Sequence, residues 1–273
     1  MTNSSIGIIG AGNMGLALAS GLVAAGVARE RLAVSDPNPD KRQAVTELGI
    51  RALADTDALA QADLLVLAVK PQHLHDLCCA LAPAMTGRHP VIVSVVAGAR
   101  TADIARWIGG EPAIVRAMPN TPALIKAGTS VLFATKHVTQ VGREAAEAVL
   151  KAVSEVFWVT DEDLMDAVTA LSGSGPAYLF LFLQALTEAG IAAGLSRALA
   201  TALAMNTTLG AALMAKTSPE EVAVLRARVT SPGGTTEQAI KSLMNDGFME
   251  MFTHAINAAT ARSQQLGKEL GAL

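Results

Sequence analysis

The sequence IGIIGAGNMG at Ile6–Gly15 contains, in this order, a short apolar run, a G-x-G-x-x-G turn and the start of an alanine-rich segment. Gly10 suits the tight turn, Gly12 lets backbone approach a pyrophosphate, and Gly15 lets a helix pack on the strand. The motif alone is also compatible with a structural glycine turn, but the order strand, turn and helix favours dinucleotide binding. The predicted cofactor-binding residues of this segment are Gly10, Gly12, Asn13, Met14 and Gly15.

Short apolar runs and alanine-rich helical runs alternate along the first part of the chain, which predicts an α/β fold with a parallel sheet and crossover helices. The predicted strands are Ile6–Ile9, Leu32–Ser35, Leu64–Val69, Val91–Val96, Ala113–Ala117, Val131–Ala134 and Glu155–Val159. After about Asp161 the periodicity is helical to the end. We therefore predict a Rossmann-like dinucleotide-binding domain over residues 1–160, followed by an all-α substrate-binding and dimerisation domain over residues 161–273.

The second predicted strand ends at Ser35 and Asp36, where the adenosine ribose of a dinucleotide would lie. A carboxylate there accepts hydrogen bonds from the ribose 2′-hydroxyl and favours NADH. Ser35 with Asn38, Lys41 and Arg42 could instead surround a 2′-phosphate and favour NADPH, and Asp36 could also be a simple turn former. The cofactor is therefore predicted as NADPH or NADH.

Two later segments end strands at the same edge of the sheet, where ligands bind in open parallel sheets. The first is Ala68, Val69, Lys70 and Pro71, whose backbone we expect to pass beside the cofactor. Lys70 could be a catalytic base, although a lysine in this position more often closes the cleft or meets phosphate. The second is Met118–Pro122, where prolines on both sides of Asn120 predict a rigid loop that lines the cofactor or is only a turn.

A second glycine turn, SPGGTTE at Ser231–Glu237, leads directly into a predicted helix. Two glycines let several N–H groups point the same way, and a helix start adds its positive end, so the segment can hold a carboxylate without a cationic side chain. We expect the N–H groups of Gly234 and Thr235 to face the anion and Thr235 to form a capping box, which leaves the Thr236 hydroxyl for the ligand. The alternative is a glycine-rich linker with an ordinary N-cap.

The 273 residues carry a net charge of −3 with acids and bases interspersed, which predicts neither nucleic-acid binding nor attraction to an anionic membrane. The adjacent pair Cys78-Cys79 suits a reducing compartment, and the absence of an export signal predicts a cytoplasmic protein.

The almost entirely apolar segment Pro176–Leu195 contains Gln184 and Glu188, which favours a helix buried by protein over a membrane span. Thin helices cannot easily cover it alone, so we expect a homodimer through the C-terminal half.

Five motifs, in this order and spacing, resemble those of the Δ1-pyrroline-5-carboxylate reductases, and the resemblance covers essentially the whole chain: Gly10–Gly15, Ala68–Pro71, Met118–Pro122, SGSGPAY at Ser172–Tyr178, and Val229–Thr236. SGSGPAY and TSPGGTT are specific, whereas GxGxxG is shared with many other enzymes. The resemblance implies reduction of 1-pyrroline-5-carboxylate to L-proline by NAD(P)H. It also implies a dimer or ring of dimers whose cofactor domain faces helices of the partner.

Carried over residue by residue, the resemblance implies that Ser231, Gly234 and Thr235 hold the substrate carboxylate and that Thr236 hydrogen-bonds the ring nitrogen. The cofactor would be lined by Gly10–Gly15, Ser35, Ala68–Pro71 and Asn120, while Asp36 departs from the small hydroxylated residue common in the family. A reductase of another cyclic imine, a hydroxyacid dehydrogenase or a nucleotide-sensing module are the alternatives. A hydroxyacid dehydrogenase is disfavoured because the central helix contains Gln184 and Glu188 but no lysine. A nucleotide-sensing module is disfavoured because it would have no use for Ser231–Thr236.

Overall fold

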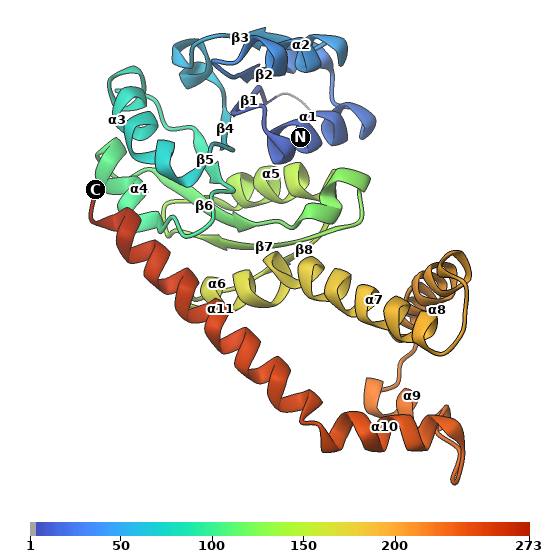
Figure 1. The fold of residues 1–273 in the computed structure, drawn as a ribbon. Helices are drawn as coiled ribbons and strands as arrows, with labels where there is room; N and C mark the ends of the chain where they lie inside the picture. The colour runs from blue at the N-terminus through green and yellow to red at the C-terminus, as the bar shows by residue number, and fades with distance from the viewer. Residues whose placement is uncertain (1–3) are drawn as a thin grey trace. The chain divides into compact units, whose positions relative to one another are not determined.

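The computed structural model describes residues 4–273. The strands are β1 (Ile6–Ile9), β2 (Leu32–Ser35), β3 (Arg51–Leu53), β4 (Leu64–Leu67), β5 (Val91–Ser94), β6 (Ala113–Met118), β7 (Gly128–Ala134) and β8 (Ser154–Trp158). The predicted strands are confirmed with small differences at their ends, and β3 is an additional short strand. Within the described residues the strands form one sheet in the order β3-β2-β1-β4-β5-β6-β7-β8 (Figure 1).

Strands β3 to β6 run parallel with β1, but β7 pairs antiparallel with β6, and β8 is parallel to β7. The expectation of an all-parallel sheet is therefore wrong for the last two strands. The cause is the short link between Met118 and Gly128, which holds only the 3₁₀ segment η4 (Thr121–Ile125). A parallel connection needs a crossover of about a dozen or more residues, so this short link reverses the chain direction.

Helices cover both faces of the sheet. One face packs against α1 (Asn13–Ala24), α2 (Pro39–Glu47) and α5 (Gln140–Lys151), and the other against α3 (Leu74–Ala84) and α4 (Thr101–Ile108). Every residue of β1 and β4 is buried, as expected for strands covered on both sides. This double cover leaves the ends of the strands, rather than the faces of the sheet, for ligands.

The remaining helices are α6 (Leu164–Val168), a π-helical turn η5 (Thr169–Gly173), α7 (Gly175–Ala192), α8 (Arg197–Thr217), α9 (Val222–Arg228), α10 (Thr235–Asn245) and α11 (Phe248–Gly271). Contacts divide the chain into two compact units. One contains the residues up to Ser174 together with Ala258–Leu273, and the other contains Gly175–Asn257. The domain boundary expected between residues 160 and 161 stays a prediction.

Candidate active site

The first glycine turn lies at the carboxyl end of β1, between β2 and β4, where the strand order of the sheet reverses. The Gly10 N–H donates to Ser35 O over 2.8 Å, and the Ala68 N–H donates to Ile9 O over 2.8 Å. Gly10 has φ of +102°, and a Cβ there would lie 2.5 Å from Ala68 O, so only glycine fits. The structure thus brings together three of the predicted cofactor segments at the position where open α/β sheets bind ligands.

Helix α1 begins after Gly12 with donors that have no protein acceptor. Gly12 offers no side-chain cap, and the first turn contains no acidic residue. The amide N–H groups of Asn13 and Met14 have no hydrogen-bond partner among residues 4–273. A Cβ at Gly12 would meet nothing within 4 Å, so the space beside the turn is open. Free amides at a helix start with open space beside them fit the pyrophosphate of a dinucleotide.

Asp36 is largely occupied by the protein itself. Its side chain is buried, and its two carboxylate oxygens accept hydrogen bonds from the Ala11 and Asn38 amides, each over 2.9 Å. Lys41 Nζ lies 3.4 Å from Asp36 Oδ2, and Arg42 donates to the Asp36 and Pro37 carbonyl oxygens. Asp36 therefore forms the local turn that the turn interpretation predicts, through the Asn38 N–H, and also holds the glycine-rich turn through the Ala11 N–H. Its contact with a ribose stays a prediction.

The other predicted cofactor residues differ in how far they face the sheet edge. Ser35 is 1% exposed, and its hydroxyl has no partner among the described residues. Lys70 is exposed just before the short segment η3 (Pro71–His73). Asn120 uses both ends of its side-chain amide, accepting from the Thr129 N–H over 2.9 Å and donating to Ser172 O over 3.1 Å. Asn120 thus ties β7 to the π-helical turn, and its contact with a cofactor stays a prediction.

A buried polar network that the sequence analysis missed lies beside these loops. Arg116, on β6 and 3% exposed, pairs with Glu162 over 3.1 Å, and Glu162 also accepts from the Thr101 amide and hydroxyl over 2.8 and 2.6 Å. The buried Ser263 hydroxyl of α11 donates to Asp166 Oδ1 over 2.7 Å. No sequence pattern indicates such a network, because its members lie far apart in the chain and are close only in the folded structure.

The second glycine turn precedes α10, and its backbone differs in two respects from the expectation. Gly234, not Thr235, is the N-cap of α10, and no side chain caps this helix. The Gly234 N–H, expected to face an anion, donates to Ser231 O over 3.0 Å. The capping box at Thr235 and the Gly234 N–H as an anion donor are therefore both wrong for this structure. A tight turn satisfies the glycine amide internally and moves the first free donors one residue into the helix.

The amide N–H groups of Thr235 and Thr236 in this turn have no acceptor within the described part of the chain. The Thr236 side chain is exposed, and its hydroxyl has no partner among residues 4–273. Ser231 is exposed beside them. Two free amides at the positive end of a helix, next to a free hydroxyl, can bind a small anion that also carries a hydrogen-bonding group.

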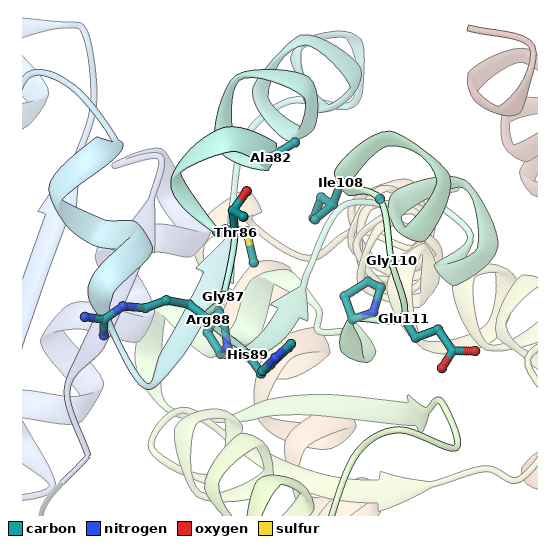
Figure 2. Close-up of a pocket in the computed structure, with 12 residues that line it drawn as sticks. Ala82, Thr86, Gly87, Arg88, His89, Ile108, Gly110 and Glu111 are labelled. Atoms are coloured by element: carbon teal, nitrogen blue, oxygen red, sulfur yellow. The ribbon is translucent and has the colours of Figure 1, made fainter.

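A separate hollow of about 360 Å³ lies at the opposite edge of the sheet, between the turns that lead into β5 and β6. It is lined by Thr86–Pro90, Gly109–Pro112 and parts of α3 and α4, and it contains none of the predicted site residues. Figure 2 shows the charged groups of Arg88 and Glu111 directed to opposite sides and away from the hollow. The hollow therefore lacks the converging polar groups of a catalytic site.

Comparisons with known proteins agree along the whole chain. A family model described as pyrroline-5-carboxylate reductase dimerisation matches residues 162–266, and one described as NADP oxidoreductase, coenzyme F420-dependent, matches residues 5–98. The pyrroline-5-carboxylate reductase of Pseudomonas aeruginosa is 46% identical over 273 residues, covering 99% of this chain and 100% of that protein. The enzyme of Pisum sativum is 38% identical and covers 96% of each chain.

Solved structures give the same result. The pyrroline-5-carboxylate reductase of Coxiella burnetii matches with a TM-score of 0.92 and 40% identity, covering 96% of this chain and 98% of that chain. The Plasmodium falciparum pyrroline carboxylate reductase, solved with NADP bound, matches with a TM-score of 0.87 and 30% identity, covering 98% and 99%. A Rossmann-like sheet with a glycine turn, a helical C-terminal part and full-length relatives together place this chain in the pyrroline-5-carboxylate reductase family.

Proposed function

We propose that this protein reduces 1-pyrroline-5-carboxylate to L-proline with NAD(P)H, the last step of proline biosynthesis. The observation that carries the proposal is the start of α10, where two free backbone amides lie beside the free hydroxyl of Thr236. The substrate offers the matching groups, a carboxylate and a ring nitrogen on adjacent parts of a small ring. Full-length relatives with this activity in their names support the same conclusion.

The cofactor would be held at the first glycine turn. Gly12, Asn13 and Met14 would bind its pyrophosphate, and the backbone of Ala68–Pro71 would run beside it. When bound, NAD(P)H supplies the hydride for the reduction. The role of the protein is to hold the substrate and the cofactor in the correct orientation, since orientation alone can lower a reaction barrier by about 7–11 kcal/mol.

The substrate would be held by backbone rather than by a cationic side chain. The amides of Thr235 and Thr236 would hold the carboxylate at the positive end of α10, with Ser231 beside them and Gly234 shaping the turn. The Thr236 hydroxyl oxygen would accept a hydrogen bond from the protonated ring nitrogen. A cyclic imine can arrive already protonated, so reduction yields an amine that needs a hydrogen-bond partner and no general acid.

The positions of the histidines are consistent with a reaction that needs no general acid. His73, His75, His89 and His137 belong to the first unit, and His254 is exposed on α11. None of them lies next to the α10 start in sequence, and the proposal assigns none a proton-transfer role. A hydroxyacid dehydrogenase would need such a donor or a lysine on the central helix, whereas α7 contains Gln184 and Glu188.

We also propose that the chain works as a homodimer or a ring of dimers in the cytoplasm. The match to the dimerisation family model supports the homo-oligomer. Helices α7 and α8 leave large apolar side chains exposed in the single chain, including Phe180 at 66%, Leu181 at 66% and Leu209 at 58%. Helix α8 is, among the described residues, the one helix long and apolar enough to cross a membrane. A partner subunit that covers these faces is consistent with the match to the dimerisation family model.

The test is a steady-state assay with pyrroline-5-carboxylate in which NADPH and NADH are varied separately. The proposal expects oxidation of at least one cofactor that depends on the substrate and yields L-proline in equal amount. If neither cofactor is oxidised, the assignment is wrong.

A further inference from the structure

Glu237 lies in the first turn of α10 and contacts the turn proposed to hold the substrate carboxylate. Its Oε2 accepts a hydrogen bond from the Gly233 N–H over 2.9 Å. Its Oε1 lies 3.3 Å from Lys241 Nζ, one helical turn further along. The carboxylate is thus held between a backbone amide and an ammonium group, so its position is set from two sides.

This contact closes the glycine turn. Gly233 has φ of +72°, a conformation that only glycine adopts readily, so its backbone needs an external restraint to stay in one state. The Gly233 N–H goes to Glu237 and the Gly234 N–H goes to Ser231 O, so both glycine amides are satisfied within the chain. The next two amides, of Thr235 and Thr236, have no acceptor among the described residues and can bind a ligand.

The same contact bears on the chemistry of the ligand. A side-chain carboxylate of the chain already accepts from one amide of this turn, at a normal hydrogen-bond distance and with no arginine or lysine between them. The turn is therefore complementary to a carboxylate in the structure itself. Lys241 offsets the negative charge of Glu237, which lowers the repulsion that a second carboxylate would meet at the neighbouring amides.

We propose that Glu237 is a positioning residue for substrate binding, which holds the Gly233-Gly234 turn so that the amides of Thr235 and Thr236 face the substrate carboxylate. This inference rests on the proposed function of the α10 start. It assigns Glu237 no contact with substrate or cofactor. The determining property is the reach of the carboxylate oxygen to the Gly233 N–H, and the negative charge itself is not required.

Three variants separate reach from charge. Glu237→Ala removes the acceptor, Glu237→Asp keeps the charge but shortens the side chain by one methylene, and Glu237→Gln keeps both length and an acceptor oxygen while removing the charge. Loss of one such hydrogen bond corresponds to roughly a 3- to 10-fold effect on a binding equilibrium. We expect Ala and Asp to raise KM for pyrroline-5-carboxylate by about that factor, with KM for the cofactor unchanged, and Gln to restore KM to near the wild-type value.

Glu250→Ala is the matched control, because Glu250 is an exposed glutamate in the first turn of α11 and lies outside the proposed sites. It should leave both KM values unchanged. A purely structural helix-capping role would instead lower the melting temperature without a selective rise in KM for the substrate, and that result would overturn the proposal. So would Gln behaving like Ala, or a cofactor KM that rises in parallel.

The failure of this inference differs from failure of the proposed function. If the wild-type enzyme turns over pyrroline-5-carboxylate and Glu237→Ala and Glu237→Asp match it in KM, only the role of Glu237 is wrong. If Glu237→Ala does not fold, the comparison of Glu237→Asp with Glu237→Gln still decides, since these two variants change the side chain least. If the wild type shows no turnover, the assignment of the α10 start falls with it.

Discussion

The Thr236 hydroxyl is the side-chain group that we propose to contact the reacting part of the substrate. Thr236→Ala removes it without changing the backbone amides, so turnover should fall roughly 10- to 1,000-fold, the range for losing one positioned hydrogen-bond partner. Thr236→Ser keeps a hydroxyl and should retain most of the activity. Turnover of Thr236→Ala equal to that of the wild type, measured at saturating substrate and cofactor, would take this residue out of the mechanism.

Asp36 permits a second test at a single residue. Because its carboxylate holds the Ala11 and Asn38 amides, Asp36→Ala should loosen the glycine turn and raise KM for NADPH and NADH alike, by roughly tenfold. The measurement is KM for each cofactor at saturating substrate. A rise confined to NADH would mean instead that Asp36 reads the ribose, as in NAD-specific Rossmann domains.

Cys78 and Cys79 should differ sharply in reactivity. Burial, together with the neighbouring Cys79, raises the pKa of the Cys78 thiol to about 12, so Cys78 stays protonated at neutral pH. Cys79 is exposed. Iodoacetamide followed by peptide mass spectrometry should find Cys79 alkylated in the native protein and Cys78 alkylated only after denaturation. Equal labelling of both in the native state would contradict the burial of Cys78.

Single residues also show where sequence reasoning stops. The glycines at residues 10, 12 and 15 could be assigned roles because each role follows from a local backbone requirement. The role of the Gly234 N–H cannot be predicted locally, because this group can donate to a ligand or to Ser231 O and only the folded turn decides between them. Asp36 and Asn120 have partners on other elements, which no local pattern reveals.

At the scale of elements, the predicted strands and the helical second half could be read from periodicity, because continuous apolar runs and helical spacing are local signals. The reversed direction of β7 and β8 relative to β6 follows from the short link between Met118 and Gly128, not from the periodicity of the strands themselves. Strand β3 has three residues and none is buried, so it carries no hydrophobic signal.

The hydrogen bond between Ser263 and Asp166 holds the end of α11 in the first unit. Ser263→Ala removes the hydrogen bond to buried Asp166 and should lower the free energy of unfolding by about 1–3 kcal/mol, because one carboxylate oxygen loses a buried donor. Ser20→Ala, an exposed serine on α1, is the control and should change stability little. Urea unfolding curves give both values. Equal stability of the two variants would show that this contact contributes nothing.

At the scale of the whole molecule, the exposed apolar faces of α7 and α8 require a covering surface. We expect light scattering to give at least a dimer at micromolar concentration, with Phe180→Glu weakening the assembly because a charge cannot be buried unpaired. A stable wild-type monomer would contradict this expectation. The association can be predicted from the sequence, because helices with few bulky side chains cannot cover an apolar helix alone. The partner surface depends on contacts between chains, which the sequence of one chain does not specify.

A crystal structure of the enzyme with L-proline and oxidised cofactor would test directly whether the start of α10 binds the substrate. We expect the proline carboxylate to bind the amides of Thr235 and Thr236, with the ring nitrogen within hydrogen-bond distance of the Thr236 hydroxyl. Proline bound elsewhere, for example in the hollow between Thr86–Pro90 and Gly109–Pro112, with the start of α10 left empty, would contradict it.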